Sequence, residues 1–456
     1  MASNPEPELD DKGESSASVV VPVQAEAFGT EDLDECEHPT VGGHIVLRDL
    51  EGSQKVFHLG NSIKDLKMGK YAAIPIEAIL GTPFGAALRR SENGSWMRHD
   101  DIEEAEDAIE DESINVTETN ENFAQNNTAQ ALSPDEISAL KKECAGEDVI
   151  AKIASSNATF AAKTKFSQEK YLRKKQRKHL QQVVILRPSA MELCETYMKN
   201  SRQKICGLRF DYLSSIICQA DVRPGGVYLV LDCALGLLCG SMAQRLAGSG
   251  RIFRAFSGGV SDKGLQELDL GEKRRVVQDL PLDVLQSIDP LAHEWVRLPP
   301  LPGPDVESTV EERSRREARV ARVEQRRQIL RDFQSCSLDA VVVVAGDEDA
   351  EIVADVVDVG LTQLSCGGRI VILGQHLQPL AARQGAMRSS GDFVDVRLTQ
   401  LFTREFQVLP QRTHPHMAAE VNHCEGFLLA ASKVAFTDGD VAIGSAPKRR
   451  RANGPR

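Results

Sequence analysis

The chain has 456 residues, a formal net charge of -13 and ten cysteines. This length is enough for two or three domains with separate hydrophobic cores. No two cysteines form a CxxC pair, and no apolar run approaches the ~20 residues that span a bilayer. The composition therefore argues against a zinc ribbon, a disulfide framework and a membrane-spanning protein, and it favours buried thiols in a reducing compartment.

Much of the acidic charge is concentrated in two segments that we expect to be unfolded. Residues 1–38 contain eleven acidic side chains and one lysine, and residues 100–112 contain nine acidic side chains in thirteen positions. We interpret residues 1–38 as a disordered acidic tail and residues 99–122 as an acidic linker. The acidic N-terminus does not have the composition of a signal peptide.

Residues 39–98 have the pattern of short strands separated by turns. Apolar and polar residues alternate on both sides of a turn at Asp49–Gly52, which indicates a hairpin. Further short strands separated by glycines predict a small β-barrel domain. The small residues of the segment 74–88 suit either a plain barrel turn or the close approach of another backbone.

Residues 123–182 are interpreted as a helical connector. Ser133 and Glu136 have the spacing of a capping box, which predicts the start of a helix. Another helix is expected over 148–155, and a third, starting near 157, carries six Lys or Arg in the ten residues 170–179. These charges fall all round the helix, which suits either a solvated face or a face that binds phosphate.

Residues 183–434 have the pattern of an α/β domain. A strand is expected at 183–187, followed by an amphipathic helix from Phe210. The run 226–259 then indicates strand, tight turn, helix and strand, which is half of a doubly wound nucleotide-binding fold. Later strands are expected at 338–344, 370–373, 393–401, 404–410 and 426–434, with the last three as closing antiparallel strands, and a helix is expected at 351–364.

The turn in this central run resembles the first motif of S-adenosylmethionine methyltransferases, in which an acid and three alternating glycines follow the first strand. Bare glycines let backbone N–H groups approach the cofactor closely. Here the series is Asp232, Ala234, Gly236, Leu238, so one glycine remains and a leucine stands where the cofactor is expected. The second strand ends at 254–256 (Arg-Ala-Phe) without the acid that holds the ribose. We therefore predict a degenerate cofactor site.

Two segments of this region carry unusual charge. Residues 260–337 are interpreted as a charged insertion, with a solvent-facing helix at 311–331 that contains eight arginines. Residues 435–456 form a basic tail, in which Lys448–Arg451 suits either nuclear import or solubility.

Catalytic and metal-binding roles are weakly supported. Asp347 suits a catalytic acid, but an acidic residue at a helix N-terminus is explained equally by the helix dipole. The group His414, His416, His423 and Cys424 does not match a structural zinc pattern. We predict no catalytic residue and no metal site.

Binding to RNA is better supported, because phosphate contacts need only cations and donors on a rigid face. The candidate RNA-binding residues are Lys163, Lys165, Lys170, Arg173, Lys174, Lys175, Arg177, Lys178, Arg209, Arg412, Thr413 and His414.

Five segments together resemble a known family, the non-catalytic subunit of the eukaryotic tRNA (adenine-58-N1) methyltransferase. They are KTKFSQEKYLRKKQRKH, ILRPSAMEL, GLRFD, LDCALGLLCGSMAQRLAGSG and FQVLPQRTHPHM. The resemblance covers residues 39–98, 123–259 and 338–434.

This resemblance implies a class I methyltransferase-like (Rossmann-like) domain that lacks activity and its own cofactor. It implies a nuclear heterotetramer of two such chains and two catalytic subunits, in which the catalytic subunits bind S-adenosylmethionine. It also implies that 170–178 and 412–414 contact tRNA. The alternatives are a divergent active S-adenosylmethionine-dependent RNA methyltransferase and a stand-alone RNA-binding scaffold.

Overall fold

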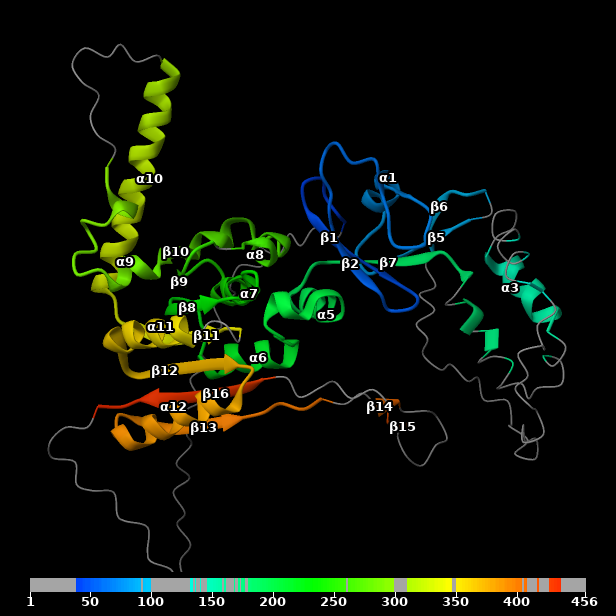
Figure 1. The fold of residues 1–456 in the computed structure, drawn as a ribbon. Helices are drawn as coiled ribbons and strands as arrows, with labels where there is room; N and C mark the ends of the chain where they lie inside the picture. Colours follow the sequence, from blue (N-terminus) through cyan, green and yellow to red (C-terminus); the bar gives the residue numbers. More distant parts are fainter. Residues whose placement is uncertain are drawn as a thin grey trace, which may run out of the picture. The chain divides into compact units, whose positions relative to one another are not determined.

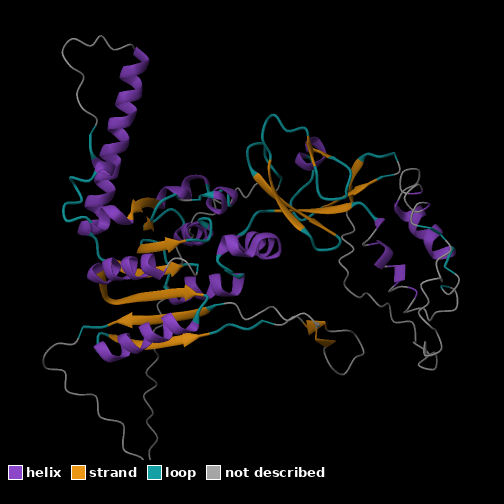
Figure 2. Cartoon of the chain, in the orientation of Figure 1, coloured by secondary structure: helices purple, strands orange, loops and turns teal. Residues whose placement is uncertain are grey.

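Two β-sheets organise the part of the chain that the computed structural model describes (Figures 1 and 2). The described residues are 38–91, 93–99, 132–133, 136, 140, 146–157, 160, 168, 171–172, 174–176, 179–259, 261–298, 310–346, 350–403, 406–407, 416–417 and 426–435. No helix among them is both long enough and apolar enough to span a membrane.

The N-terminal sheet has five strands in the spatial order β2-β1-β7-β5-β6. The strands are β1 (His44–Asp49), β2 (Gln54–His58), β5 (Ala87–Arg90), β6 (Trp96–His99) and β7 (Gln182–Leu186). A separate pair, β3 (Asp65–Leu66) and β4 (Ile74–Pro75), precedes the short helix α1 (Ile76–Leu80). No pair joins β2 to β6 among the described residues, so the predicted closed barrel is not confirmed.

Strand β7 corrects the expectation that residues 183–187 open the α/β domain. It pairs antiparallel with both β1 and β5 and is therefore the central strand of the N-terminal sheet. Val183 and Ile185 are fully buried in the core of this sheet with Ile45 and Leu47. The chain thus leaves the N-terminal sheet, passes through the connector and returns to complete it.

Two local predictions in this part of the chain are confirmed. Strands β1 and β2 form the predicted hairpin, in which Asp49 Oδ1 accepts hydrogen bonds from the backbone N–H groups of Glu51 and Ser53. The capping box is also present, because Ser133 N donates to Glu136 Oε2 at 2.8 Å and Glu136 N donates to Ser133 Oγ at 3.3 Å. The helix expected at 148–155 is α3 (Gly146–Ser155).

The second sheet has seven strands in the spatial order β10-β9-β8-β11-β12-β16-β13. Its strands are β8 (Val227–Asp232), β9 (Arg251–Phe256), β10 (Val277–Pro281), β11 (Leu338–Val344), β12 (Leu364–Gly374), β13 (Phe393–Thr399) and β16 (Phe427–Lys433). Strands β8 to β12 pair in parallel, whereas β16 pairs antiparallel with both β12 and β13. Numbered along the chain, the order is 3-2-1-4-5-7-6 with the seventh strand reversed. This is the plan of a class I methyltransferase domain, so the predicted fold class is confirmed.

Helices cover both faces of this sheet. The helices are α5 (Ala190–Ser201), η3 (Arg202–Ile205), α6 (Phe210–Gln219), α7 (Leu237–Leu246), α8 (Lys263–Glu267), η4 (Gly271–Val276), α9 (Leu282–Gln286), η5 (Glu294–Val296), α10 (Val310–Ser335), α11 (Ala350–Gln363) and α12 (Leu377–Ser390). One face packs against α5, α6 and α7, and the other packs against α9, α10, α11 and α12. Gly360 lets α11 lie close to the sheet, since a Cβ there would come within 2.6 Å of Val341 Cγ2.

Two expectations about the C-terminal half are wrong. Residues 260–337 are not an insertion, because they contain β10, which pairs with β9, and helix α10, whose second half is part of the core. The segment 404–410 does not close the main sheet. Its described part is β14 (Phe406–Gln407), which pairs only with β15 (His416–Met417).

Candidate functional site

The candidate cofactor site lies at the carboxyl end of β8, where the strand order of the sheet reverses between β8 and β11. Ligands of doubly wound folds bind in the crevice at such a switch point. Asp232 is the last residue of β8, and its Oδ1 accepts a hydrogen bond from Ala234 N at 2.8 Å. Its Oδ2 accepts from Cys239 N, also at 2.8 Å. The carboxylate therefore closes the turn between β8 and α7.

Burial raises the pKa of Asp232. The two N–H donors and the charge of Arg254 lower it, but burial has the larger effect. A buried carboxylate with these partners is a structural group that holds the turn. The turn itself has two residues with positive φ, Leu235 at 60° and Gly236 at 80°. Gly236, the one glycine that remains in the series, therefore stands at a position whose positive φ favours glycine.

Side chains of the chain itself occupy the space in front of Gly236. A Cβ at Gly236 would lie 2.9 Å from Leu265 Cβ and 3.3 Å from Arg254 Nη1. Leu265 belongs to α8, and the start of this helix is fixed on the turn because Gly264 N donates to Leu235 O at 2.9 Å. The bare backbone that would face a cofactor therefore faces a leucine and a guanidinium.

Arg254 is the largest fully buried side chain of the described residues, with 1% of its surface exposed. Its Nη1 lies 2.6 Å from Asp262 Oδ1, and its Nε donates to Asp279 Oδ1 at 2.6 Å. Asp262 is shared with Arg274, whose Nη2 lies 3.1 Å from its second oxygen. We call Arg254, Asp262 and Asp279 the Arg254 cluster. The cluster places a cation, Arg254, in the second strand, which in an active methyltransferase carries the acid that holds the ribose.

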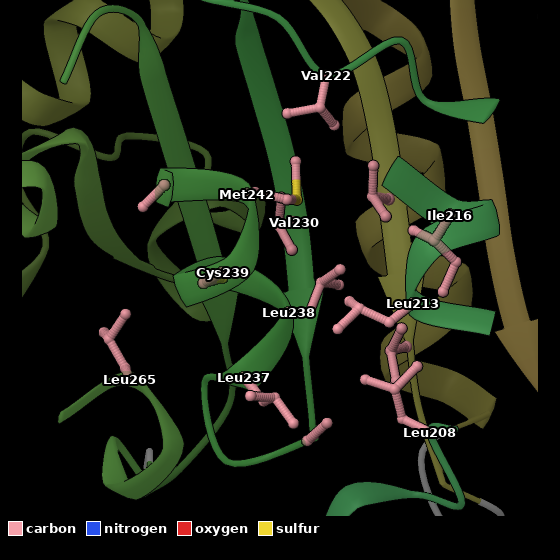
Figure 3. Packing of buried hydrophobic residues seen from close by; sticks show 14 of the residues in the cluster. Leu208, Leu213, Ile216, Val222, Val230, Leu237, Leu238, Cys239, Met242 and Leu265 are labelled. Atoms are coloured by element: carbon pink, nitrogen blue, oxygen red, sulfur yellow. The ribbon is translucent and has the colours of Figure 1, made fainter. Parts of the chain in front are cut away.

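Leu238 has a different position from the one expected. It is fully buried in the hydrophobic core of α6, α7 and β8. Figure 3 shows it among Leu213, Met242 and Val230. The expectation that Leu238 fills the cofactor space is wrong, and Leu265 and Arg254 fill the space before Gly236 instead. Ala234 is also fully buried.

Of the predicted RNA contacts in the basic helix, only Lys174 and Lys175 lie in the described residues. Lys174 is exposed, and Lys175 Nζ lies 5.2 Å from the centre of the Tyr171 ring. Burial, and then the neighbouring Lys174, lowers the pKa of Lys175. The candidates outside the described residues are Lys163, Lys165, Lys170, Arg173, Arg177, Lys178, Arg412, Thr413 and His414.

Arg209 is 7% exposed. Its Nε donates to Asp211 Oδ1 at 2.9 Å, and its Nη2 donates to Asp211 Oδ2 at 2.5 Å and to Leu401 O at 3.1 Å. Its guanidinium also lies over the Tyr212 ring. These contacts give Arg209 a structural role in joining α6 to the end of β13, and they leave little of it accessible to RNA.

A cavity of about 730 Å³ lies beside η3, at the carboxyl end of β12. Its lining residues are Asn200, Ser201, Arg202, Gln203, Lys204, Gly207, Gln375, His376 and Gly426. The side chains of Arg202 and Lys204 are exposed at its wall. Tyr212 fixes the far wall, since its Oη donates to Gly426 O at 2.6 Å. The cavity therefore combines amide groups with two strong cations, a set that suits an anion or a nucleotide.

The Arg254 cluster and this cavity were not predicted from the sequence. An arginine inside an apolar strand was the available signal for the cluster, since such a charge is buried only with partners. Asp347 and the group of His414, His423 and Cys424 lie outside the described residues, as do the side-chain contacts of His416. No group of three or more potential metal ligands occurs in the part of the chain that the structure describes.

Comparison with known proteins identifies similar chains. The sequence profile of the Gcd10p family matches residues 40–328. The non-catalytic subunit trm6 of tRNA (adenine(58)-N(1))-methyltransferase from Dictyostelium discoideum is 28% identical, over 86% of this chain and 79% of the relative. The subunit of the same name from Mus musculus is 23% identical, over 75% of this chain and 78% of the relative. Among solved structures, a SAM-dependent O-methyltransferase from Thermotoga maritima aligns with a TM-score of 0.47 and 12% identity, over 88% of this chain and 97% of the other.

Proposed function

The chain belongs to the Gcd10p family, and on that premise we propose that it is the non-catalytic subunit of a tRNA (adenine-58-N1) methyltransferase. In this role it binds tRNA and presents it to a catalytic subunit. The catalytic subunit holds S-adenosylmethionine and methylates the adenine in the T-loop. The observation that carries the non-catalytic role is the position of Leu265 and Arg254, which lie where a Cβ on Gly236 would meet them.

Shape and charge support the proposal that this subunit binds no cofactor. S-adenosylmethionine needs a bare turn for its amino-acid and sulfonium part and an acceptor for its ribose hydroxyls. In this chain Leu265 lies against the turn, and the strand that would carry the acceptor carries Arg254. The guanidinium has no acceptor lone pair, so it cannot accept a hydrogen bond from a ribose hydroxyl.

Binding to tRNA is supported by exposed cations. Lys174 lies on the basic connector, and Arg202 and Lys204 lie at the wall of the cavity beside η3. Each phosphate contact releases counterions, so affinity falls steeply with salt. Replacing Arg173, Lys174, Lys175 and Lys178 with alanine is expected to weaken tRNA binding and to flatten this dependence.

A control variant removes two cations from an exposed part of the methyltransferase-like domain. Lys273→Ala with Arg275→Ala takes two exposed charges from η4, where Arg275 forms an exposed pair with Glu272. We expect the control to leave both the affinity and the salt slope nearly unchanged. If the salt dependence of the connector variant is unchanged, the replaced residues do not contact tRNA.

The partner, the stoichiometry and the location follow from the same proposal. We propose two of these chains and two catalytic subunits in one particle, working in the nucleus, with Lys448–Arg451 as the import signal. Light scattering of the co-expressed complex measures the stoichiometry, and imaging of a Lys448–Arg451 deletion measures the import.

The function is tested by co-expression with a candidate catalytic subunit and a methyl-transfer assay on tRNA. We expect transfer only when both chains are present. Transfer by this chain alone would support a divergent active enzyme. Recovery of the chain from cell extract without a methyltransferase subunit would support a stand-alone scaffold.

A further inference from the structure

Helix α10 carries a row of arginines on one face. Arg315, Arg319, Arg322 and Arg326 are all exposed and are separated by four, three and four residues. This spacing places them above one another on the helix surface. At 1.5 Å per residue the row is about 16 Å long. We call these four residues the arginine row.

Two acidic residues of α10 lie opposite the arginine row, whereas Glu311 lies on the same side as the row and pairs with Arg315. Glu317 and Glu324 are seven residues apart and lie on the side of the helix opposite the arginine row. All eight cations of the helix are arginines and none is a lysine. Arginine is the side chain that binds phosphate through two parallel hydrogen bonds, so this choice favours phosphate over a general requirement for solubility.

The second half of α10 fixes the helix on the domain. Leu330 and Phe333 are buried, and the Phe333 ring packs edge-on against Phe253 at 5.2 Å. Arg326 donates to Trp295 O at 3.2 Å and lies over the Trp295 ring. The row therefore starts at an anchored residue and continues along the helix away from the core.

The first half of α10 has few partners. Residues 311–322 are exposed or half-buried, and Figure 1 shows this half of the helix extending away from the sheet. Arg315 forms a 3.6 Å pair with Glu311 in which both side chains are at least 80% exposed, and such pairs contribute little. Arg322 Nε donates to the carbonyl oxygen of Ala318 in its own helix at 3.2 Å. These guanidinium groups keep most of their donors directed to solvent.

We infer that the arginine row is an RNA-binding arm that holds successive phosphates of the tRNA backbone. This inference rests on the proposed function, which supplies the RNA. A fixed row of guanidinium groups about 16 Å long matches a continuous phosphate backbone, which presents negative charge at regular intervals. The contacts position the RNA and carry no sequence information.

The test compares two triple variants of the complete complex. Arg315→Ala, Arg319→Ala and Arg322→Ala remove the outer part of the arginine row and leave Arg326 at its anchor. The control variant, Arg313→Ala, Arg316→Ala and Arg331→Ala, removes the same charge from other faces of the same helix. Alanine preserves helix formation, so neither variant is expected to unfold α10.

Equilibrium binding of an unmodified tRNA transcript is measured over a range of salt concentrations. For the row variant we expect at least tenfold weaker binding and a salt slope lower by about two to three, since each phosphate contact contributes about 0.7 to 0.9. The control variant should keep nearly the wild-type slope. Equal behaviour of the two variants would overturn the inference. So would loss of the catalytic subunit from the row variant with unchanged tRNA affinity, because the row would then bind protein. If the wild-type complex itself fails to bind tRNA, the proposed function fails, and that outcome is distinct.

Discussion

Arg254 and Asp279 are joined across neighbouring parallel strands, with Arg254 Nε donating to Asp279 Oδ1 at 2.6 Å. The register pairs these two residues directly, so the sheet itself aligns the guanidinium with the carboxylate. Asp262, which precedes α8, forms an ion pair with the other side of the guanidinium, its Oδ1 lying 2.6 Å from Arg254 Nη1. The cluster thereby links β9, β10 and the start of the helix that covers the degenerate turn.

Removing the acids of the Arg254 cluster should destabilise the chain more than replacing the arginine. Asp262→Ala with Asp279→Ala removes both direct ion-pair partners of a buried guanidinium and is expected to cost about 3–5 kcal/mol. Arg254→Met removes the charge and keeps much of the volume, so it should cost clearly less. Urea unfolding of the three proteins measures the difference. A larger loss for Arg254→Met would contradict the assignment of Arg254 as a charge that needs its partners.

Restoring a glycine at position 238 should not create a cofactor site. Leu238→Gly leaves a cavity in the core and a glycine inside α7, which together should cost about 3–5 kcal/mol. Leu265 and Arg254 still cover Gly236, so calorimetry should detect no binding of S-adenosylmethionine. Leu246→Ala, another fully buried change in α7, is the control for stability. Micromolar binding by Leu238→Gly would show that Leu238 is the obstacle after all.

The hydrogen bond between Tyr197 and Glu267 should be needed to hold α8 in place. Tyr197 Oη donates to Glu267 Oε2 at 2.5 Å, and both side chains are buried. Tyr197→Phe leaves the carboxylate without this donor and is expected to cost about 1–3 kcal/mol. Tyr71→Phe is the matched control, because its buried hydroxyl has no hydrogen-bond partner among the described residues. Thermal unfolding should separate the two variants, and equal losses would refute a role for the Tyr197 hydroxyl.

Glu192 should make the stability of the chain fall as pH rises. Burial raises its pKa in the folded state, so the folded state keeps the proton to higher pH than the unfolded state. Glu192 therefore stabilises the folded state at pH values below its pKa in the unfolded chain. This stabilisation is lost as the pH rises through its pKa in the folded chain. Glu192→Gln keeps an oxygen that accepts from Gln54 Nε2. The stability of the variant relative to wild type should increase from pH 4 to pH 7, and a constant difference would contradict the shift.

The sequence predicted most of the parallel sheet because its strands are short apolar runs. Val227–Asp232 and Leu338–Val344 are buried on both faces, and such runs are recognisable without partners. Strand β10 (Val277–Pro281) was missed because its sequence, VQDLP, has no apolar run or clear alternation. Strand β7 was found, but its sheet was not, since an apolar strand does not specify which neighbours it pairs with.

At the candidate site, the degenerate turn was predicted from the sequence, but the side chains that cover it were not. The replacement of two turn glycines is visible in the series 232–238, so the degenerate turn could be identified. The side chains that fill the space come from Arg254 and from Leu265, which is 29 positions beyond Gly236. Such a contact depends on how α8 packs on the turn. No local pattern encodes it.

We propose that this chain carries no S-adenosylmethionine, and the number of cofactor sites in the complete complex shows whether it does. Equilibrium binding of labelled S-adenosylmethionine to the purified complex counts sites per particle. We expect one site for each catalytic subunit and the same count when this chain carries Leu238→Gly. Two sites for each pair of unlike chains would mean that this chain also binds the cofactor, because the second site would have to lie beside Gly236.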